Sequence, residues 1–138
     1  MGIKLKVDKT NILYLVLFEL EDKPLVKIGV TGRHIEDRMA EIATSVFHQY
    51  RYFPYIYPKR FRNVSEAYEK EKILHDHFDG YRYNTIHHFS GCTEFFDIPL
   101  STAVDAYECL LEGKPLVYKE PLQEEEIQVL DESELHFD

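Results

Sequence analysis

The sequence predicts an α/β fold, a small antiparallel or mixed sheet flanked by helices, in the order strand-strand-helix-strand-helix-strand-helix. Apolar runs of strand character alternate with segments whose apolar residues recur every three or four positions, which predicts helices packed on a sheet. The chain has 138 residues, 44% of them hydrophobic, enough for one modest core. We therefore expect one domain over residues 11–118, preceded by an edge strand or arm at 1–10 and followed by an acidic tail at 119–138.

Two strands and a helix open the domain. Residues 11–20 are almost continuously Leu, Ile, Val, Tyr and Phe, which is typical of a strand buried on both faces. Residues 25–30 fit an antiparallel partner across the charged turn at 21–24. After a break at Gly32, a helix is predicted from its apolar stripe, which consists of Ile35, Met39, Ile42, Ala43 and Val46.

The aromatic run at 50–58 favours a third strand. Pro54 and Pro58 confine that strand to an edge or to short pieces, because proline cannot donate a backbone hydrogen bond. Ser65 is expected to cap the second helix, which should end at Gly80.

The last third of the domain contains a loop, a strand and a helix. Residues 81–91 are polar and without period, which is typical of a loop or a mobile lid. Residues 93–98 favour a short strand. Ser101 is expected to cap a third helix that ends at Gly113.

The net charge of −9 is concentrated near the C-terminal end. Residues 119–138 carry eight acids and one base, a net charge of −7, which leaves −2 for residues 1–118. Nucleic-acid binding needs Lys and Arg, so the total charge argues against it, but the body is nearly neutral and has a basic run at 59–62. This distribution of charge fits a catalytic module that depends on a partner for its affinity. It equally fits a protein that never contacts DNA.

The sequence predicts neither a membrane segment nor a cysteine framework. No apolar run reaches about 18 residues, and the first residues lack the apolar core of a secretion signal. We therefore expect a cytoplasmic protein without a membrane partner. Cys92 and Cys109 are interpreted as reduced packing residues.

Four short motifs follow one another along the chain. They are Tyr14 in Leu-Tyr-Leu-Val, Lys27-Ile28-Gly29 followed by Thr31, Arg38 on the next helix, and the stretch 67–75 (AYEKEKILH). In this order they resemble the GIY-YIG nuclease superfamily, over residues 11–112. The likeness is greatest to the bacteriophage and mobile-element subgroup whose second tripeptide is KIG, which would place the protein in the cytoplasm of a host cell.

The resemblance implies a metal-dependent endonuclease with Tyr14, Lys27, Arg38 and Glu71 as its catalytic residues. Glu71 matches the family's metal-binding glutamate, and a carboxylate suits Mg²⁺ or Mn²⁺, whereas composition alone would make it one more solvated charge. Arg38 offers paired donors to a scissile phosphate, and its alternative is a surface ion pair with a neighbouring acid.

The two remaining catalytic candidates differ in how well they match the family. Tyr14 matches a tyrosine that orients or activates the nucleophile, although a tyrosine among aliphatic residues is usually a core residue. Lys27 replaces the second family tyrosine, a change that the KIG subgroup shares. A lysine there would hold a phosphate or position water.

The substrate-binding candidates are Gly29, Thr31, His75, Asn84 and Glu94. Glu94 stands in the acid-aromatic position of the subgroup and Asn84 lies in the preceding loop, and the sequence does not decide which of them replaces the family's late asparagine. His75 is expected to support the site at one remove or to pack under the loop.

The sequence thus predicts a Mg²⁺- or Mn²⁺-dependent endonuclease module that hydrolyses or nicks DNA. It contains no recognised DNA-reading element, so specificity would come from a homodimer, a protein partner or the loop at 80–91. The alternatives are a non-catalytic nucleic-acid- or protein-binding regulator that retains the fold and an RNA-processing nuclease. The basic-aromatic run around 52–62 fits either a nucleic-acid surface or aromatic side chains packed on a helix.

Overall fold

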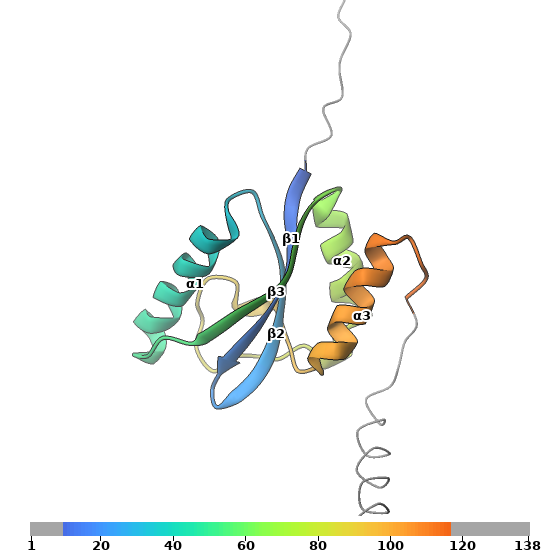
Figure 1. Cartoon of the computed structure of the whole chain (residues 1–138). Helices are drawn as coiled ribbons and strands as arrows, with labels where there is room; N and C mark the ends of the chain where they lie inside the picture. Colours follow the sequence, from blue (N-terminus) through green and yellow to red (C-terminus); the bar gives the residue numbers. More distant parts are fainter. Residues whose placement is uncertain (1–9, 117–138) are drawn as a thin grey trace, which may run out of the picture.

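The computed structural model describes residues 10–116 and orders their elements as the sequence predicts (Figure 1). The elements are β1 (Thr10–Leu20), β2 (Lys23–Thr31), α1 (Ile35–Tyr50), β3 (Tyr55–Ser65), α2 (Ala67–His77), the short 3₁₀ turns Asp79–Tyr81 and Cys92–Glu94, β4 (Phe95–Phe96) and α3 (Leu100–Leu111). The predicted α/β class and element order are confirmed. The arm expected at 1–10, apart from Thr10, and the tail expected at 119–138 lie outside the described residues.

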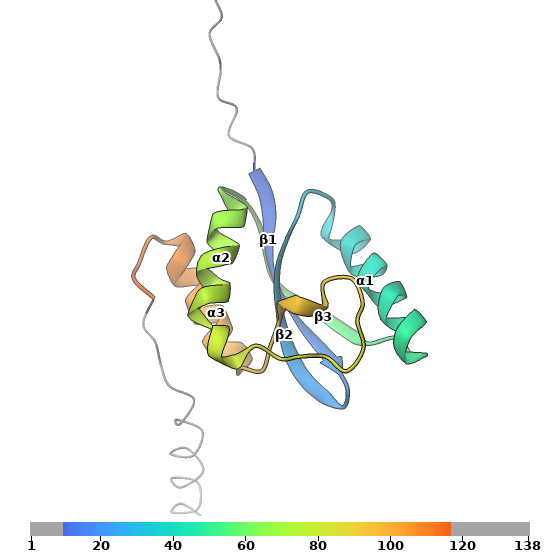
Figure 2. The same cartoon turned by 180° about the vertical axis from the view of Figure 1, so that it is seen from behind.

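The strands form one sheet in the order β3-β1-β2-β4, in which every neighbouring pair is antiparallel. Helix α1 lies on one face, and helices α2 and α3 lie on the other (Figures 1 and 2). The hairpin between β1 and β2 turns at Glu21 and Asp22, whose φ angles are 56° and 60°. Positive φ at both central residues gives a turn whose twist matches that of the paired strands.

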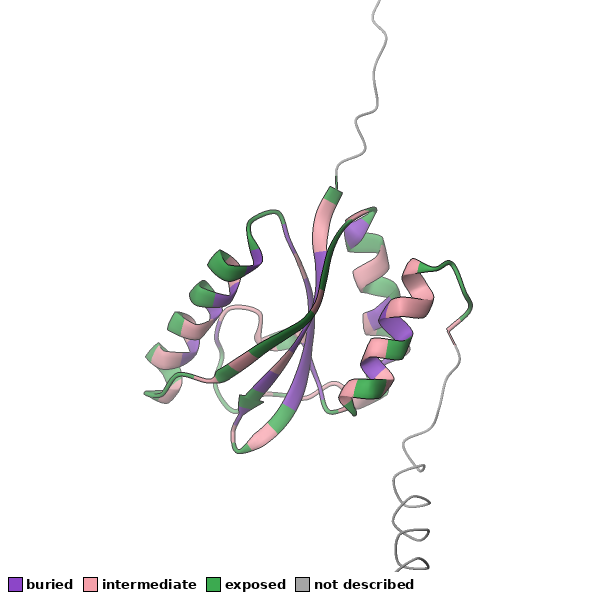
Figure 3. Ribbon diagram, viewed as in Figure 1, coloured by how far each residue is buried: buried purple, intermediate pink, exposed green. Residues whose placement is uncertain are grey.

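Each face of the sheet contributes to its own apolar core (Figure 3). Alternate residues of β1 point to opposite faces, so one strand supplies both cores. The core under α1 contains Tyr14, Val16, Phe18, Ile35, Met39, Ile42 and Val46. The core under α2 and α3 contains Leu13, Leu15, Ile28, Leu74, Phe96, Ala103 and Tyr107.

The third strand differs from its prediction. It begins at Tyr55, after Pro54, and continues to Ser65, so the basic run at 59–62 lies in a strand. β3 is an edge strand, as expected from its prolines, and its register against β1 shifts between Leu15 and Val16, next to Pro58. An edge strand needs hydrogen-bonding partners on one side only, which allows it to contain proline and charged residues.

The predicted serine caps are wrong. Ser65 is the last residue of β3, and Glu66, with φ of 53°, precedes α2 without a side-chain cap. Ser101 lies inside the first turn of α3, which follows Pro99. Proline fixes φ near the value that a helix start requires, so α3 can begin without a serine cap. Gly113, with φ of 73°, follows the end of α3 as predicted.

The segment between α2 and α3 contains less strand than expected. β4 comprises Phe95 and Phe96 only, because residues 92–94 form a 3₁₀ turn. Residues 82–91 have neither helix nor strand, as predicted, apart from a bridge between Arg82 and Phe96. Because β4 is short, no strand of the described chain pairs with the outer edge of β2 beyond Lys27. The candidate site lies at this unpaired edge.

Two smaller observations concern cysteine and membranes. Cys92 and Cys109 are both free and half-buried, in agreement with the prediction that they are reduced. Within residues 10–116, no helix combines the length and the apolar character that crossing a membrane requires.

Candidate functional site

The side chain of Lys27 lies at the centre of the site and is completely buried. Its Nζ donates a 2.9 Å hydrogen bond to the hydroxyl oxygen of Tyr14 and forms an ion pair with Glu94. The register pairs Val16 with Lys27 and Tyr14 with Gly29, so the lysine and the tyrosine extend from neighbouring strands on the face that α1 covers. An ammonium group this deep is tolerated only because oxygen atoms surround it.

Glu71 of α2 and Glu94 form the acidic part of the site. Burial, together with the nearby charge of Glu94, raises the pKa of Glu71 to about 7, although Lys27 opposes the shift. The two carboxyl groups are also joined by a hydrogen bond. Two carboxylates so close together favour shared protonation or a bound cation over two full negative charges.

Gly29 permits the close approach of these groups. A Cβ atom added at this position would lie 2.9 Å from Oε1 of Glu94 and would overlap the phenol of Tyr14. Any side chain here would therefore separate Tyr14 from Glu94. The glycine of the KIG tripeptide consequently has a steric role at the site.

His75 contacts the backbone of the same strand. Its Nε2 donates a 2.7 Å hydrogen bond to the carbonyl oxygen of Ile28, and its ring packs 5.1 Å from the ring of Phe96. Burial lowers the pKa of His75, which favours the neutral imidazole. His75 therefore joins α2 to β2. This position is consistent with the expected role, in which His75 supports the site without contacting the reacting groups.

Arg38 reaches the site from α1 and is held there by two contacts. Its Nη1 donates a 3.0 Å hydrogen bond to Oγ of Ser90 and pairs with Glu41, the neighbouring acid foreseen as its alternative partner. The side chain of Arg38 is 16% exposed. Arg38 is thus more accessible than Lys27, and a ligand would meet its guanidinium group first.

The loop at 82–91 covers the lysine. A Cβ atom added at Gly91 would lie 2.8 Å from both Cε and Nζ of Lys27 and 3.4 Å from Nη2 of Arg38. The φ angle of Gly91 is 81°, a conformation that residues with a side chain rarely adopt. The backbone N–H of Ser90 donates a 2.9 Å hydrogen bond to Oγ of Ser45, which fixes this end of the loop on α1.

Glu21 fixes the other end of the loop. Its carboxylate accepts hydrogen bonds from the Tyr50 hydroxyl, from the Tyr83 hydroxyl at 2.5 Å and from the N–H of Ile86 at 2.7 Å. Tyr50 in turn accepts a 3.2 Å hydrogen bond from the N–H of His87. The segment expected to be a mobile lid is therefore tied to the β1–β2 turn and to α1.

The structure brings six of the nine predicted site residues around one strand edge and places a seventh, Arg38, next to them. The six are Tyr14, Lys27, Gly29, Glu71, His75 and Glu94, and Arg38 approaches across Gly91. Thr31 is buried, and its Oγ1 accepts a 3.1 Å hydrogen bond from the N–H of Arg33, outside this cluster. Asn84 is exposed in the loop between α2 and β4.

Sequence reasoning missed Ser90, Gly91 and Glu21. A Ser-Gly pair after an aromatic residue is a weak signal, because many loops contain one. The sequence indicates only that Glu21 belongs to a charged turn, and nothing in it indicates that two tyrosines converge on its carboxylate. These roles depend on contacts between segments that are distant along the chain.

Fold and site together define the class of the protein. It is a small α/β domain in which the hairpin of β1 and β2 presents a tyrosine and a lysine, and in which α2 and the turn Cys92–Glu94 add two carboxylates beside them. More particularly, the chain belongs to the T5orf172 domain family, whose model matches residues 11–111. This domain is found in nucleases of phages and mobile elements. No curated protein and no solved structure matches the chain.

Proposed function

We propose that this protein is a divalent-metal-dependent endonuclease module of the GIY-YIG type that hydrolyses or nicks DNA. The observation that carries the proposal is the buried Lys27, which bonds to both Tyr14 and Glu94 while Glu94 contacts Glu71. Buried ion pairs contribute little net stability, because desolvation offsets their attraction. A catalytic role therefore explains this buried charged cluster at the unpaired edge of β2 better than a role in stabilising the fold.

The acidic pair suits a divalent cation. Mg²⁺ prefers oxygen ligands and is commonly held by one or two carboxylates together with water and substrate phosphate. Glu71 and Glu94 supply such oxygens, and a cation would relieve the repulsion that raises the pKa of Glu71. Residues 10–116 contain no cluster of three or more His, Cys, Asp and Glu side chains arranged as metal ligands, which leaves the two carboxylates as the donor set. The ion would balance the negative charge that develops on the phosphate oxygens.

The residues of the chain divide the remaining tasks. Arg38, the most accessible cation of the site, would bind the non-bridging oxygens of the scissile phosphate. Lys27 holds the hydroxyl oxygen of Tyr14 and the carboxylate of Glu94 in place. The hydroxyl hydrogen of Tyr14 then remains to orient a water molecule towards the phosphorus. Specificity would come from a homodimer or a protein partner.

A second candidate is a non-catalytic regulator that retains the fold. The full burial of Tyr14 and Lys27 favours it, because groups that a loop covers cannot touch substrate while that loop is in place. Such a protein would bind DNA or a protein partner without turnover. The two candidates differ in one property, which is metal-dependent cleavage.

The deciding experiment compares Glu71→Gln with Glu69→Gln in a plasmid relaxation assay with Mg²⁺ or Mn²⁺. Glu69 is an exposed acid on the same helix and serves as the matched control. We expect Glu71→Gln to abolish cleavage and to change the free energy of unfolding by less than about 1 kcal/mol, since burial already disfavours the charged carboxylate. Glu69→Gln should cut as the wild type does. A wild-type chain that cuts neither DNA nor RNA with any divalent ion would establish the regulator instead.

A further inference from the structure

Two exposed tyrosine rings stand next to each other on the edge strand β3. Tyr55 and Tyr57 are 68% and 41% exposed, their ring centres are 6.5 Å apart, and their planes differ by 8°. They pair with Glu19 and Leu17 of β1, whereas Ile56 between them faces the core under α1. The rings therefore lie on the opposite face from that core and add nothing to it.

The charge of β3 is unlike that of the whole chain. The strand contains three basic residues and no acid, in a protein with a net charge of −9. The ammonium group of Lys59 lies 5.6 Å from the centre of the Tyr57 ring. Arg60 and Arg62 share one carboxylate, that of Glu108, so their combined charge is only half balanced.

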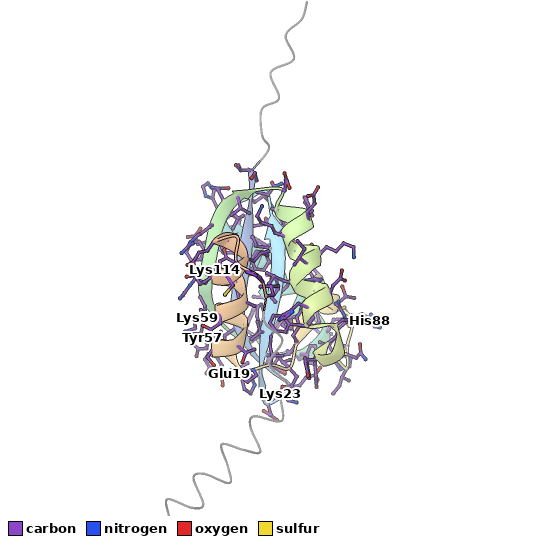
Figure 4. All side chains as sticks on the ribbon, turned by 90° about the vertical axis from the view of Figure 1, so that its right-hand side faces the viewer. Glu19, Lys23, Tyr57, Lys59, His88 and Lys114 are labelled. Atoms are coloured by element: carbon purple, nitrogen blue, oxygen red, sulfur yellow. The ribbon has the colours of Figure 1, made fainter. Side chains whose placement is uncertain are left out.

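The separation of the rings corresponds to a nucleic-acid dimension. Successive bases along a strand are about 3.4 Å apart, so a base between two parallel rings needs a spacing of about 6.8 Å. The ring centres of Tyr55 and Tyr57 are 6.5 Å apart, so a small movement of either side chain would admit one base. Stacking on aromatic rings combined with a basic track for the backbone is how proteins hold single strands without reading their sequence. Figure 4 shows Lys59, Tyr57 and Glu19 one after another along the edge beside α3, with His88 on the opposite side.

We propose that an unpaired DNA strand binds along β3, with one base stacked against Tyr55 and Tyr57 and the adjoining phosphates beside Lys59, Arg60 and Arg62. The inference rests on the proposed function and deepens it, because it names the form of DNA that the protein engages. Glu19 limits the surface at one end. Its carboxylate accepts a 3.4 Å hydrogen bond from Tyr57, so phosphates are repelled from that end of the surface and drawn towards Lys59.

Fluorescence anisotropy with a labelled oligo-dT tests the proposal. The full chain is used with a chelator, so that binding is measured without cleavage. The Tyr55→Ala/Tyr57→Ala variant should bind about tenfold more weakly, the loss expected for one stacked base. Tyr55→Phe/Tyr57→Phe, which keeps both rings, should bind as the wild type does. Phe53→Ala is the matched control, because Phe53 is 60% exposed but stacks on Phe47 at 4.6 Å.

Charge variants provide a second, independent measurement. Glu19→Gln should tighten binding at low salt, since it removes the acid next to the rings. Lys59→Ala should weaken binding and reduce the slope of log affinity against log salt by about 0.7, the value for one phosphate contact on a single strand. A gain of affinity in Glu19→Gln cannot arise from misfolding, which makes this arm robust against unstable variants.

Three outcomes would overturn the proposal. The first is a wild-type chain that does not bind oligo-dT, and the second is an equal loss of affinity in Phe53→Ala and in the double tyrosine variant. The third is a change from dimer to monomer in the double tyrosine variant by sedimentation, because a second copy would then cover β3. Normal Glu71-dependent cleavage with tyrosine-independent binding would reject this surface and keep the nuclease. Tyrosine-dependent binding without any cleavage would keep the surface and reject the nuclease.

Discussion

Gly91 and Gly113 have nearly the same backbone conformation but different surroundings. Their φ angles are 81° and 73°, yet an added Cβ atom would press against Lys27 at Gly91 and would meet nothing within 4 Å at Gly113. Alanine at either position strains the backbone by about 1–2 kcal/mol. Only alanine at Gly91 also displaces the ammonium group from Tyr14 and Glu94.

Gly91→Ala should therefore affect activity far more than Gly113→Ala does. In urea denaturation we expect Gly113→Ala to lose about 1–2 kcal/mol of unfolding free energy, and Gly91→Ala to lose more because it also displaces the buried ammonium group. Gly91→Ala should in addition slow plasmid cleavage by at least about tenfold, which corresponds to roughly 1.4 kcal/mol of transition-state stabilisation. Equal cleavage rates in the two variants would mean that the position of Lys27 does not matter for the reaction.

At the scale of single residues, the sequence predicts those site members that belong to short motifs on regular elements. Tyr14, Lys27 and Glu71 follow from the resemblance of the motifs that contain them, and all three lie on regular elements, β1, β2 and α2. Gly91 could not be predicted in the same way, because its role comes from the side chain of Lys27, which lies 64 positions earlier in the sequence. A glycine in a loop has the same local pattern whether or not a side chain lies against it.

At the scale of elements, one carboxylate, that of Glu21, holds one end of the loop at 82–91. Burial raises the pKa of Glu21, but hydrogen bonds from Tyr50, Tyr83 and the Ile86 N–H outweigh it and hold the pKa below its ordinary value of 4.5. A folded-state pKa lower than the unfolded one stabilises the fold above the unfolded pKa. That stabilisation is lost as the pH falls through the lower, folded value.

Glu21→Gln should consequently make unfolding less dependent on pH. At neutral pH we expect the variant to be less stable by about 1–3 kcal/mol, since it weakens hydrogen bonds to a charged acceptor. The difference from the wild type should shrink as the pH falls below 4.5, the ordinary pKa of the group. Asp22→Asn, at the other positive-φ position of the turn, is the control. Parallel pH profiles for wild type and Glu21→Gln would contradict the role of the carboxylate.

The differences between predicted and observed elements share a physical cause. β3 is longer than expected because an edge strand tolerates charged and aromatic residues that a central strand excludes. β4 is shorter because residues 92–94 form a 3₁₀ turn, whose backbone does not pair with β2. The sequence predicts helix starts at serines, yet Glu66 precedes α2 and Pro99 precedes α3. The backbone conformation of the residue before each helix decides where that helix begins.

At the scale of the whole molecule, the site and the DNA surface proposed on β3 occupy opposite sides of the sheet. β1 separates β3 from β2, which corresponds to about 10 Å across two strand spacings. A nucleic-acid strand bound on β3 therefore reaches Arg38 only by passing around the end of the sheet. Residues 1–118, which would bind such a strand, have a net charge near zero, whereas residues 119–138 have a net charge of −7.

A chain that ends at Tyr118 tests the effect of this charge. We expect the shorter chain to keep the melting temperature and the oligomeric state of the full chain and to bind oligo-dT more tightly at low salt. The gain should fade as salt rises, because exposed charges are screened over about 10 Å at 0.1 M. Equal binding at every salt concentration would exclude an electrostatic role for the tail. A lower melting temperature, or a change from dimer to monomer in sedimentation, would instead indicate that the tail anchors the body or a dimer.

The loop that seals Lys27 also sets a thermodynamic limit on any ligand that has to touch this lysine. With Lys27 fully buried under Gly91, such a ligand binds only the fraction of molecules in which the loop is open, and its apparent dissociation constant is the intrinsic constant divided by that fraction. Each tenfold decrease in the fraction of molecules with an open loop therefore weakens the binding of such a ligand by about 1.4 kcal/mol. The same hydrogen bonds at Glu21 and Ser45 that stabilise the resting protein thereby lower its affinity for these ligands.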